Sequence, residues 1–406
     1  MAQTATPAPL PELSCRVTDT LEQVPAGAWN ALAGPAQPFL RHEFLLALEQ
    51  TGCVGAGTGW HPRHLLLHAG EKLVGAAPMY LKTHSYGEFV FDWSWAEAYA
   101  RAGRDYYPKL ISAVPFTPVT GPRLLIDPTL PGDVIRGAAG NAALEVAERM
   151  EASSVHWLFT SEPDSQALAA AGYVLRAGCQ FHWRNPGFRD FQDYLDSLRS
   201  KKRKQIRRER REAERSGLEI EVLSGADLEE THCDAYHELY SATYDRKWGY
   251  PSLSREFFHS LRQSLADALV LVLARRGRRY VAGAHLLRGQ TRLFGRNWGR
   301  SEYHPCVHFE VCYYRPMEYA IARGLEVFEA GAQGEHKLSR GFLPVATWSA
   351  HGLLDADFRR AVAEFTRREQ AEIRAYIEAM GRHSPYHPSR LPASPAVSGV
   401  RSGPKG

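Results

Sequence analysis

Two stretches of the sequence, HEFLLALEQ at 42–50 and REFFHSLRQ at 255–263, are similar and begin two similar series of elements. Each is followed by an apolar run, a glycine turn and a second apolar run, in HLLLHAGEKLVGAAPMYL (64–81) and LVLVLARRGRRYVAGAHLL (269–287). Apolar runs on both sides of a turn predict β-hairpins, and the two stretches before them predict helices. The repeated order indicates an internal duplication. Chance similarity of two helix starts is the alternative.

The two halves continue in the same order after the hairpins. Each has an aromatic-rich region, then a helix at about 133–151 or 308–323, then a short strand at 155–160 or 325–330. This order resembles that of the GNAT acyltransferase fold. It implies an α/β (α+β) protein with tandem GNAT-like domains, whose mixed sheets are flanked by helices.

The domain boundary is expected near Asn185 to Asp190, where Asn185, Pro186 and Gly187 interrupt a predicted strand. The predicted organisation is a disordered tail at 1–12, a first GNAT-like domain at 13–187, a second at 188–382 and a disordered tail at 383–406. Asp355 is expected to cap a C-terminal helix at 355–380, which should close the core.

Size and composition exclude several classes of protein. The 406 residues allow two hydrophobic cores, and 44% hydrophobic with 23% charged residues excludes a mainly disordered or fibrous chain. The start resembles no secretory signal and no apolar run could span a bilayer, so we expect a cytoplasmic protein without a transmembrane segment. The six scattered cysteines indicate free, mostly buried thiols.

The positive charge is concentrated in one predicted helix, 199–215, which carries ten basic and three acidic residues while the whole chain is only +4. A solvated basic face is one interpretation of such a run. The other is a polyanion site, binding tRNA, a nucleotide or an anionic lipid headgroup. Its candidate residues are Lys201, Lys202, Arg203, Lys204, Arg207 and Arg208.

Several long motifs carry a resemblance to a known family. They are LKTHSYGEFVFDWSWAEAYARAG (81–103), YYPKLISAVPFTPVTGPRLL (106–125), SKKRKQIRRERR (200–211), HFEVCYYRPMEYAI (308–321) and GAQGEHKLSRGFLP (331–344). In this order they resemble the FemAB-like N-acyltransferases of bacteria, distant relatives of the Fem aminoacyltransferases. The resemblance covers about 29–376 and implies acyl or aminoacyl transfer to an amine, with a peptidoglycan-precursor peptide as the suggested acceptor.

The motif GAQGEHKLSRGF follows a predicted strand directly and is the predicted chemical site. Amide formation needs a base for the attacking amine and donors for the tetrahedral oxyanion. His336 is the readier base because free histidine titrates near neutrality, with Glu335 and Glu329 as rivals and Lys337 as the cation. Gln333 and Arg340 are expected to contact substrate. The alternative is a charged loop whose ions pair with one another.

A second candidate site is the aromatic-rich region from Tyr80 to Tyr107. Alternation there predicts a strand that places Phe89, Phe91, Trp93 and Trp95 on one face. This face either covers the core or forms a substrate groove. The candidate binding residues are Lys82, His84, Tyr86, Asp92, Trp93, Tyr106, Tyr107 and Lys109, and in the second half Arg296 and Trp298.

No cofactor is predicted, and the donor stays open between acyl-CoA and aminoacyl-tRNA. The pyrophosphate loop of acetyl-CoA-dependent GNAT enzymes is missing, and the Fem relatives use aminoacyl-tRNA. His308 and Glu310 lack the cysteine spacing of a deaminase zinc site, so no metal is predicted. The competing function is a non-catalytic GNAT-derived scaffold that binds RNA or an anionic membrane through the basic helix.

Overall fold

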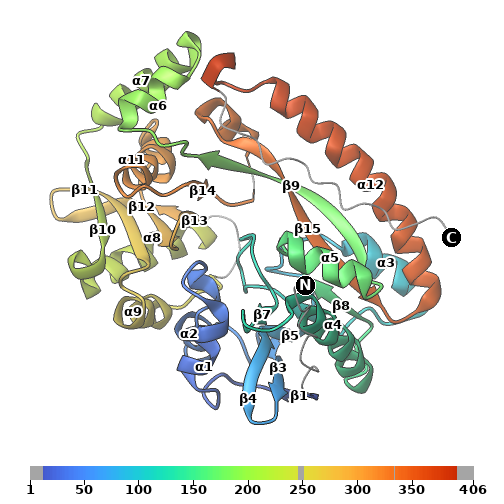
Figure 1. The fold of residues 1–406 in the computed structure, drawn as a ribbon. Coiled ribbons are helices and arrows are strands. Elements are labelled where there is room, and N and C mark those ends of the chain that lie inside the picture. Colours follow the sequence, from blue (N-terminus) through green and yellow to red (C-terminus); the bar gives the residue numbers. More distant parts are fainter. Residues whose placement is uncertain (1–11, 246–250, 333, 391–406) are drawn as a thin grey trace, which may run out of the picture.

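The computed structural model describes residues 12–245, 251–332 and 334–390 (Figure 1). The first half of the chain contains β1 (Leu13–Thr18), α1 (Ala26–Ala33), η1 (Pro38–Leu40), α2 (His42–Gln50), β2 (Trp60–Pro62), β3 (His64–Ala69), β4 (Lys72–Ala77), β5 (Met79–Lys82), α3 (Trp93–Arg101), β6 (Lys109–Ser112), β7 (Leu125–Ile126), α4 (Gly132–Arg149), β8 (Ser154–Trp157), α5 (Glu162–Ala170) and β9 (Val174–Arg184).

The second half contains α6 (Phe191–Ser197), α7 (Ser200–Glu214), β10 (Glu219–Ser224), η2 (Gly225–Asp227), α8 (Glu230–Asp245), α9 (Arg255–Ser264), β11 (Leu269–Arg276), β12 (Arg279–Arg288), β13 (Arg292–Arg300), α10 (Val307–Phe309), a π-helical turn η3 (Glu310–Tyr314), α11 (Arg315–Ala322), β14 (Val327–Glu329), η4 (Glu335–Arg340), β15 (Leu343–Leu353), α12 (Ala356–Arg382) and η5 (Pro388–Arg390). The mixed α/β class, both hairpins and the predicted helices at 42–50, 255–263, 133–151, 199–215 and 355–380 are confirmed within a few residues.

The strands form a four-stranded sheet, β1-β3-β4-β7, and an eleven-stranded sheet, β10-β11-β12-β13-β14-β9-β15-β8-β6-β5-β2. In the central part of the larger sheet, parallel and antiparallel strand pairs follow in the same order from either end. β13 pairs in parallel with β14, as β6 does with β8, and β9 and β15 pair antiparallel at the centre. This pseudo-twofold arrangement supports the predicted duplication.

The last strand of each half joins the sheet of the other half. β9 of the first half pairs with β14, and β15 of the second half pairs with β8. The two equivalent helices α2 and α9 also meet, with the rings of Phe44 and Phe257 5.5 Å apart. The halves are therefore interlocked rather than placed side by side.

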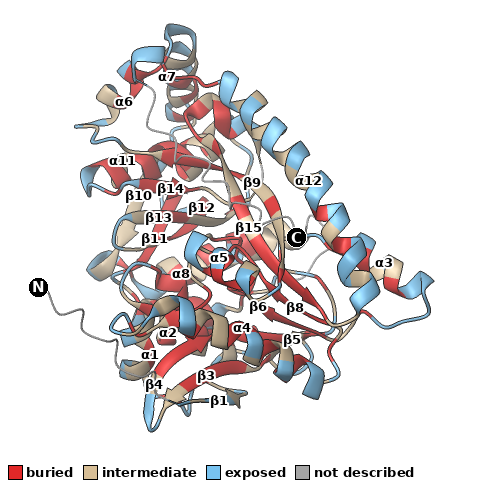
Figure 2. Cartoon of the chain, turned by 45° about the vertical axis from the view of Figure 1, so that its right-hand side comes forward, coloured by how far each residue is buried: buried red, intermediate tan, exposed pale blue. Residues whose placement is uncertain are grey.

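Helices cover the sheets on both faces, and the buried residues follow the strands (Figure 2). The long helix α12 lies along β9 and β15 (Figure 1), but only Val362 and Thr366 of it are buried. It covers the paired terminal strands with one narrow stripe and exposes the rest of its surface.

Two sequence predictions are wrong. The predicted strand through Phe89 to Trp95 does not form, because Phe89 has a left-handed backbone (φ 63°) and α3 begins at Trp93. The second tail does not begin at His383: Tyr386 is fully buried, and its hydroxyl donates to the carbonyl oxygen of Gly341 at 2.9 Å. The rest of both predicted tails, 1–11 and 391–406, lies outside the described residues.

Candidate active site

A cleft opens where β13 and β14 part. The two parallel strands are in register at only three pairs, from Arg292–Val327 to Phe294–Glu329. Just beyond, β13 bulges, so that Arg296 and Asn297 together lie opposite His285 of β12. Bulges re-aim side chains and end pairing, and they are common beside active sites. The separation leaves a cleft of about 560 Å³ between the strands.

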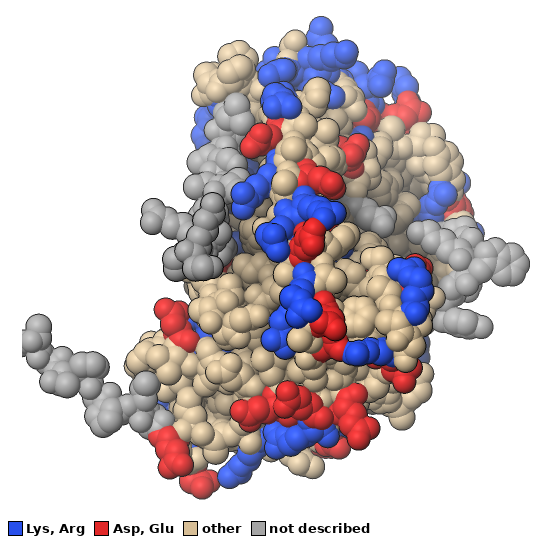
Figure 3. Space-filling view, turned by 90° about the vertical axis from the view of Figure 1, so that its right-hand side faces the viewer, with Lys and Arg blue, Asp and Glu red and all other residues tan. Residues whose placement is uncertain are grey.

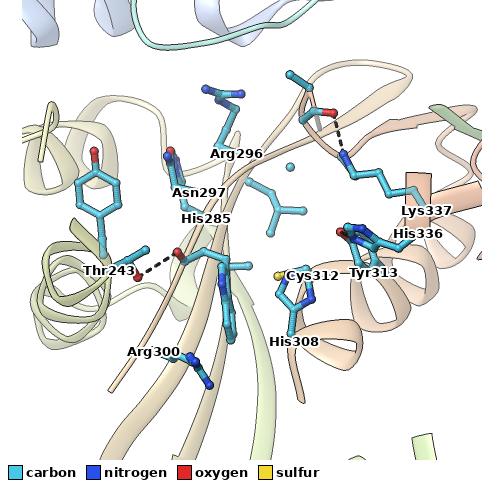
Figure 4. Close-up of a pocket in the computed structure, with 18 of the residues that line it drawn as sticks. Thr243, His285, Arg296, Asn297, Arg300, His308, Cys312, Tyr313, His336 and Lys337 are labelled. Carbon is cyan, nitrogen blue, oxygen red and sulfur yellow. Dashed lines mark hydrogen bonds between the residues drawn. The ribbon is translucent and has the colours of Figure 1, made fainter. Parts of the chain in front are cut away.

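The cleft has two walls that belong to opposite faces of the sheet (Figure 4). The first wall consists of α8 and the strand residues that face it. The second wall consists of the helical segment that follows β13 and of η4. Arg296 turns to one side and donates to the carbonyl oxygen of Phe116, whereas the ring of Trp298 lies 4.7 Å from that of His308 on the second wall. The bulge separates these two side chains, which strict alternation would place on one face.

His336 and Tyr313 lie together on the second wall (Figure 4). The hydroxyl of Tyr313 lies 2.9 Å from Nε2 of His336. Burial, and then the charges of Arg340 and Lys337, lower the pKa of His336 below its ordinary value. The imidazole is therefore neutral near pH 7 and can accept a proton.

Lys337 is almost fully buried at the same wall, and its ammonium group donates to the carbonyl oxygen of Gly331 at 2.8 Å. Burial lowers its pKa to about 8. Burial also lowers the pKa of the neighbouring His308 to about 4. Near neutral pH Lys337 is therefore a cation, whereas the neighbouring imidazoles of His308 and His336 are neutral.

Among the described residues, the other candidates of this motif do not line the cleft. Glu335 is exposed and accepts a hydrogen bond from the hydroxyl of Tyr376 at 2.7 Å. Glu329 forms an ion pair with Arg292 at 2.6 Å. Successive residues of a strand face opposite sides of the sheet, so Glu329 faces away from the cleft, which the next residue, Ala330, lines. Gln333 lies outside the described residues.

Arg340 holds the motif in place instead of facing the cleft. It forms a buried two-point ion pair with Glu209 of α7, at 2.8 and 2.9 Å. It also donates to the backbone carbonyl oxygen of His336 at 2.8 Å. The alternative interpretation of the motif, a loop whose ions pair with one another, does not describe Arg340, because its carboxylate partner lies on α7.

The aromatic-rich region forms a separate buried cluster around Lys109. Its ammonium group contacts Asp92, Glu88 at 2.8 Å and Ser85 at 2.8 Å, and Tyr106 donates to Asp92 at 2.6 Å. Burial raises the pKa of Glu88 to about 7. Since Lys109, Asp92 and Tyr106 are buried, the structure brings these predicted binding residues together without exposing them to a ligand.

The remaining predicted residues of this region lie around that cluster. Lys82 is buried, with its ammonium group 3.9 Å above the ring of Trp60 and 3.3 Å from His84. Tyr107 contacts Ser85, and Tyr86 and Trp93 remain exposed. Phe89, which lies between β5 and α3, lines the cleft.

The predicted basic helix is α7. Only some of its predicted cationic side chains have a polar side-chain partner among the described residues. Arg203 is bound to Asp196 and Arg207 to Gln192, whereas Lys202 lies partly buried beside η4. Lys201, Lys204 and Arg208 are exposed and have no side-chain partner within the described residues. Figure 3 shows basic side chains gathered at the α7 end of the molecule, whereas acidic and basic groups alternate over the rest of that face.

Sequence reasoning missed much of the lining. His285, Tyr240 and Cys312 stand in apolar runs or helices that resemble ordinary core. His308 was considered only as a metal ligand, and its partner in that hypothesis, Glu310, is paired with Arg210 at 2.8 Å. The described residues contain no group of three or more His, Cys, Asp or Glu side chains that could hold a metal ion.

A family described as peptidoglycan biosynthesis/recognition, FemAB_like, matches residues 20–388. The chain belongs to the FemAB-like family. No curated protein matches it by sequence. Within the described part of this family member, no helix is both long and apolar enough to cross a membrane.

Solved structures share its fold. The crystal structure of FemX is 12% identical with a TM-score of 0.51, and the match covers 87% of this chain and 100% of FemX. The C-terminal domain of a lysylphosphatidylglycerol synthetase candidate from Agrobacterium fabrum is 12% identical with a TM-score of 0.53, over 84% of this chain and 95% of that domain. At such identities the likeness concerns the fold.

Proposed function

We propose that this FemAB-like chain is an N-acyltransferase that transfers an acyl or aminoacyl group to an amine in the cleft between β13 and β14. The observation that carries the proposal is the pairing of a neutral base, His336, with a buried cation, Lys337, in a cleft lined from both faces of one sheet. A donor and an acceptor can enter along different walls and meet at the parting of the strands.

His336 is the proposed general base. Its Nε2 atom lies within reach of Tyr313 at the cleft wall, while the carboxylate of its rival Glu335 is turned toward Tyr376. A neutral imidazole removes the proton that the attacking ammonium must lose. Lys337 then stabilises the oxyanion that forms when the amine adds to the carbonyl carbon.

Direct attack is favoured over a covalent acyl-enzyme. Cys312 is a thiol of the cleft lining, and burial raises its pKa well above the ordinary value. A thiol that holds its proton is a poor nucleophile. The amine of the acceptor therefore attacks the donor carbonyl itself, and the donor's carrier leaves.

The proposed acceptor is an amine-bearing peptidoglycan-precursor peptide, as the family description suggests. The donor is acyl-CoA or aminoacyl-tRNA, and the exposed cations of α7 are the proposed contact for a polyanionic carrier. We place the reaction in the cytoplasm, where both donors are made.

The test is a transfer assay with both donor classes. Wild-type protein is incubated with the amine-bearing peptide precursors of a bacterial extract and either acetyl-CoA or fully charged total tRNA, and mass spectrometry detects the new amide. Ala332→Trp should fill the cleft and abolish the product, whereas Ala361→Trp, on the exposed side of α12, should not. Absence of product with both donors, combined with tRNA binding, would instead favour the scaffold function.

A further inference from the structure

The floor of the cleft contains a buried imidazole that lacks hydrogen-bond partners. His285 is 2% exposed and lines the cleft, and neither of its ring nitrogens has a partner among the described residues. Buried polar groups are normally satisfied, because leaving one unpaired costs its full desolvation penalty. A partner for His285 is therefore expected from whatever fills the cleft.

Its surroundings restrict what that partner can be. The rings of Phe258 and Tyr236 lie 5.3 and 5.7 Å from the imidazole. Burial and the nearby charge of Arg296 lower the pKa of His285 to about 3. The ring is therefore neutral near pH 7 and offers one N–H donor within the electrostatic influence of Arg296.

The charge of the lining points the same way. Arg296, Arg300 and Lys337 line the cleft, and none of the described lining residues is Asp or Glu. Arg296 donates one N–H group to the carbonyl oxygen of Phe116, and this hydrogen bond fixes the position of the guanidinium group. The cleft thus favours a ligand that carries a negatively charged group.

We propose that His285 and Arg296 form a subsite on the cleft floor for an anionic oxygen group of the substrate, a carboxylate or a phosphate. This inference rests on the proposed function, because it takes the cleft as the substrate site. The imidazole donates its N–H group to one oxygen, and Arg296 supplies the opposite charge. A substrate whose inner end is plain hydrocarbon leaves His285 unpaired and binds more weakly, so this pair selects for substrates that carry such a group.

The test is a binding measurement that needs no turnover. Protein labelled with ¹⁵N in its histidine rings is titrated with sodium acetate or with inorganic phosphate, at constant ionic strength, while ring signals are followed by NMR. The signals missing from His285→Leu identify this residue. We expect them to shift in a saturable way with at least one probe, and Arg296→Gln to weaken that binding by about tenfold.

The controls separate the subsite from its alternatives. His232→Leu, on α8 but in contact with Tyr280 away from the cleft, should leave the titration unchanged. Saturation by acetate alone assigns a carboxylate, and saturation by phosphate alone assigns a phosphate. No saturable shift with either probe, or equal affinity in Arg296→Gln, overturns the proposal. Anion binding without any amide product would remove the proposed function and leave the subsite standing.

Discussion

His336 and Lys337 are adjacent in the chain, and their surroundings in the cleft lower the pKa of both side chains. Near neutral pH His336 is therefore a neutral base, whereas Lys337 is still a cation. The pKa of His336 falls below its ordinary value, and that of Lys337 falls to about 8. Between these two values the imidazole is neutral and the ammonium group is charged. We therefore expect kcat/KM to rise through the lowered pKa of His336 and to fall again near pH 8.

Lys337→Met should remove the falling limb. Methionine keeps the length of the side chain and removes its charge, so the rate above pH 8 should no longer depend on this group. Loss of an oxyanion donor should also lower the plateau, by about 10²–10³-fold. The measurement is kcat/KM across the pH range, and persistence of the same fall near pH 8 would show that another group titrates there.

The sequence could predict part of the cleft at this scale. His336, Lys337, Arg296 and Trp298 stand in motifs dense in charged or aromatic residues, and all four reach the cleft. His285 could not be found, because it follows Ala284 in an apolar strand and reaches the cleft only where the next strand bulges.

Helix α7 has a buried side that anchors η4. Glu209 holds Arg340, and Arg340 holds the carbonyl of His336. Glu209→Gln leaves the buried arginine without its counter-charge and should lower the free energy of unfolding by about 3–5 kcal/mol. Glu212→Gln, which loses only a surface pair with Arg215, should change it by less than about 1 kcal/mol. Urea unfolding compares the two, and equal effects would mean that the pair does not anchor η4.

The opposite side of α7 is predicted to bind a polyanion. Changing Lys201, Lys204 and Arg208 to Gln should weaken binding of tRNA and flatten its salt dependence, because fewer counterions are released. The same change at three exposed arginines of α12, Arg360, Arg367 and Arg374, is the control. If wild-type protein shows no salt-dependent binding of tRNA, nucleotides or anionic vesicles, this side is only a solvated surface.

Sequence reasoning misjudged residues 89–95, which span the end of the loop before α3 and the first turn of that helix. Alternating aromatic residues predicted a strand, whereas Trp95 and Tyr99 are buried on one side of a helix, four residues apart. Glu88 and Asp92 are also four residues apart, and both contact Lys109. The ionic contact with a distant strand, which no local pattern reveals, decides the conformation there.

At the scale of the whole molecule, the exchange of β9 and β15 makes each half depend on the other. A chain cut after Gly187, the proposed domain boundary, should yield a first half in which β9 has lost both of its neighbouring strands and β8 is left as an unpaired edge. We expect this half to aggregate or to lack cooperative unfolding alone, and to form a folded complex when both halves are produced together. Size-exclusion chromatography and circular dichroism check this, and a monomeric first half that unfolds cooperatively would contradict it.

The duplication was readable from the sequence, but the exchange was not. The similar stretches at 42–50 and 255–263 give the order of elements in each half. A strand was predicted where β9 ends and none at β15, and neither stretch of sequence specifies its neighbours in the sheet. Partner choice depends on contacts between residues more than a hundred positions apart, such as Glu329 with His182.

The most direct test of the account is the rate of amide formation by His336→Gln and Glu335→Gln, measured against pH in the same transfer assay. If His336 is the base, its replacement should slow transfer by about 10²–10⁴-fold and abolish the rising limb of the pH profile, while Glu335→Gln keeps both. His383→Gln, at an exposed histidine after α12, controls for the loss of an imidazole. Near wild-type rates in folded His336→Gln, with the rising limb intact, would contradict the assignment of catalysis to this cleft.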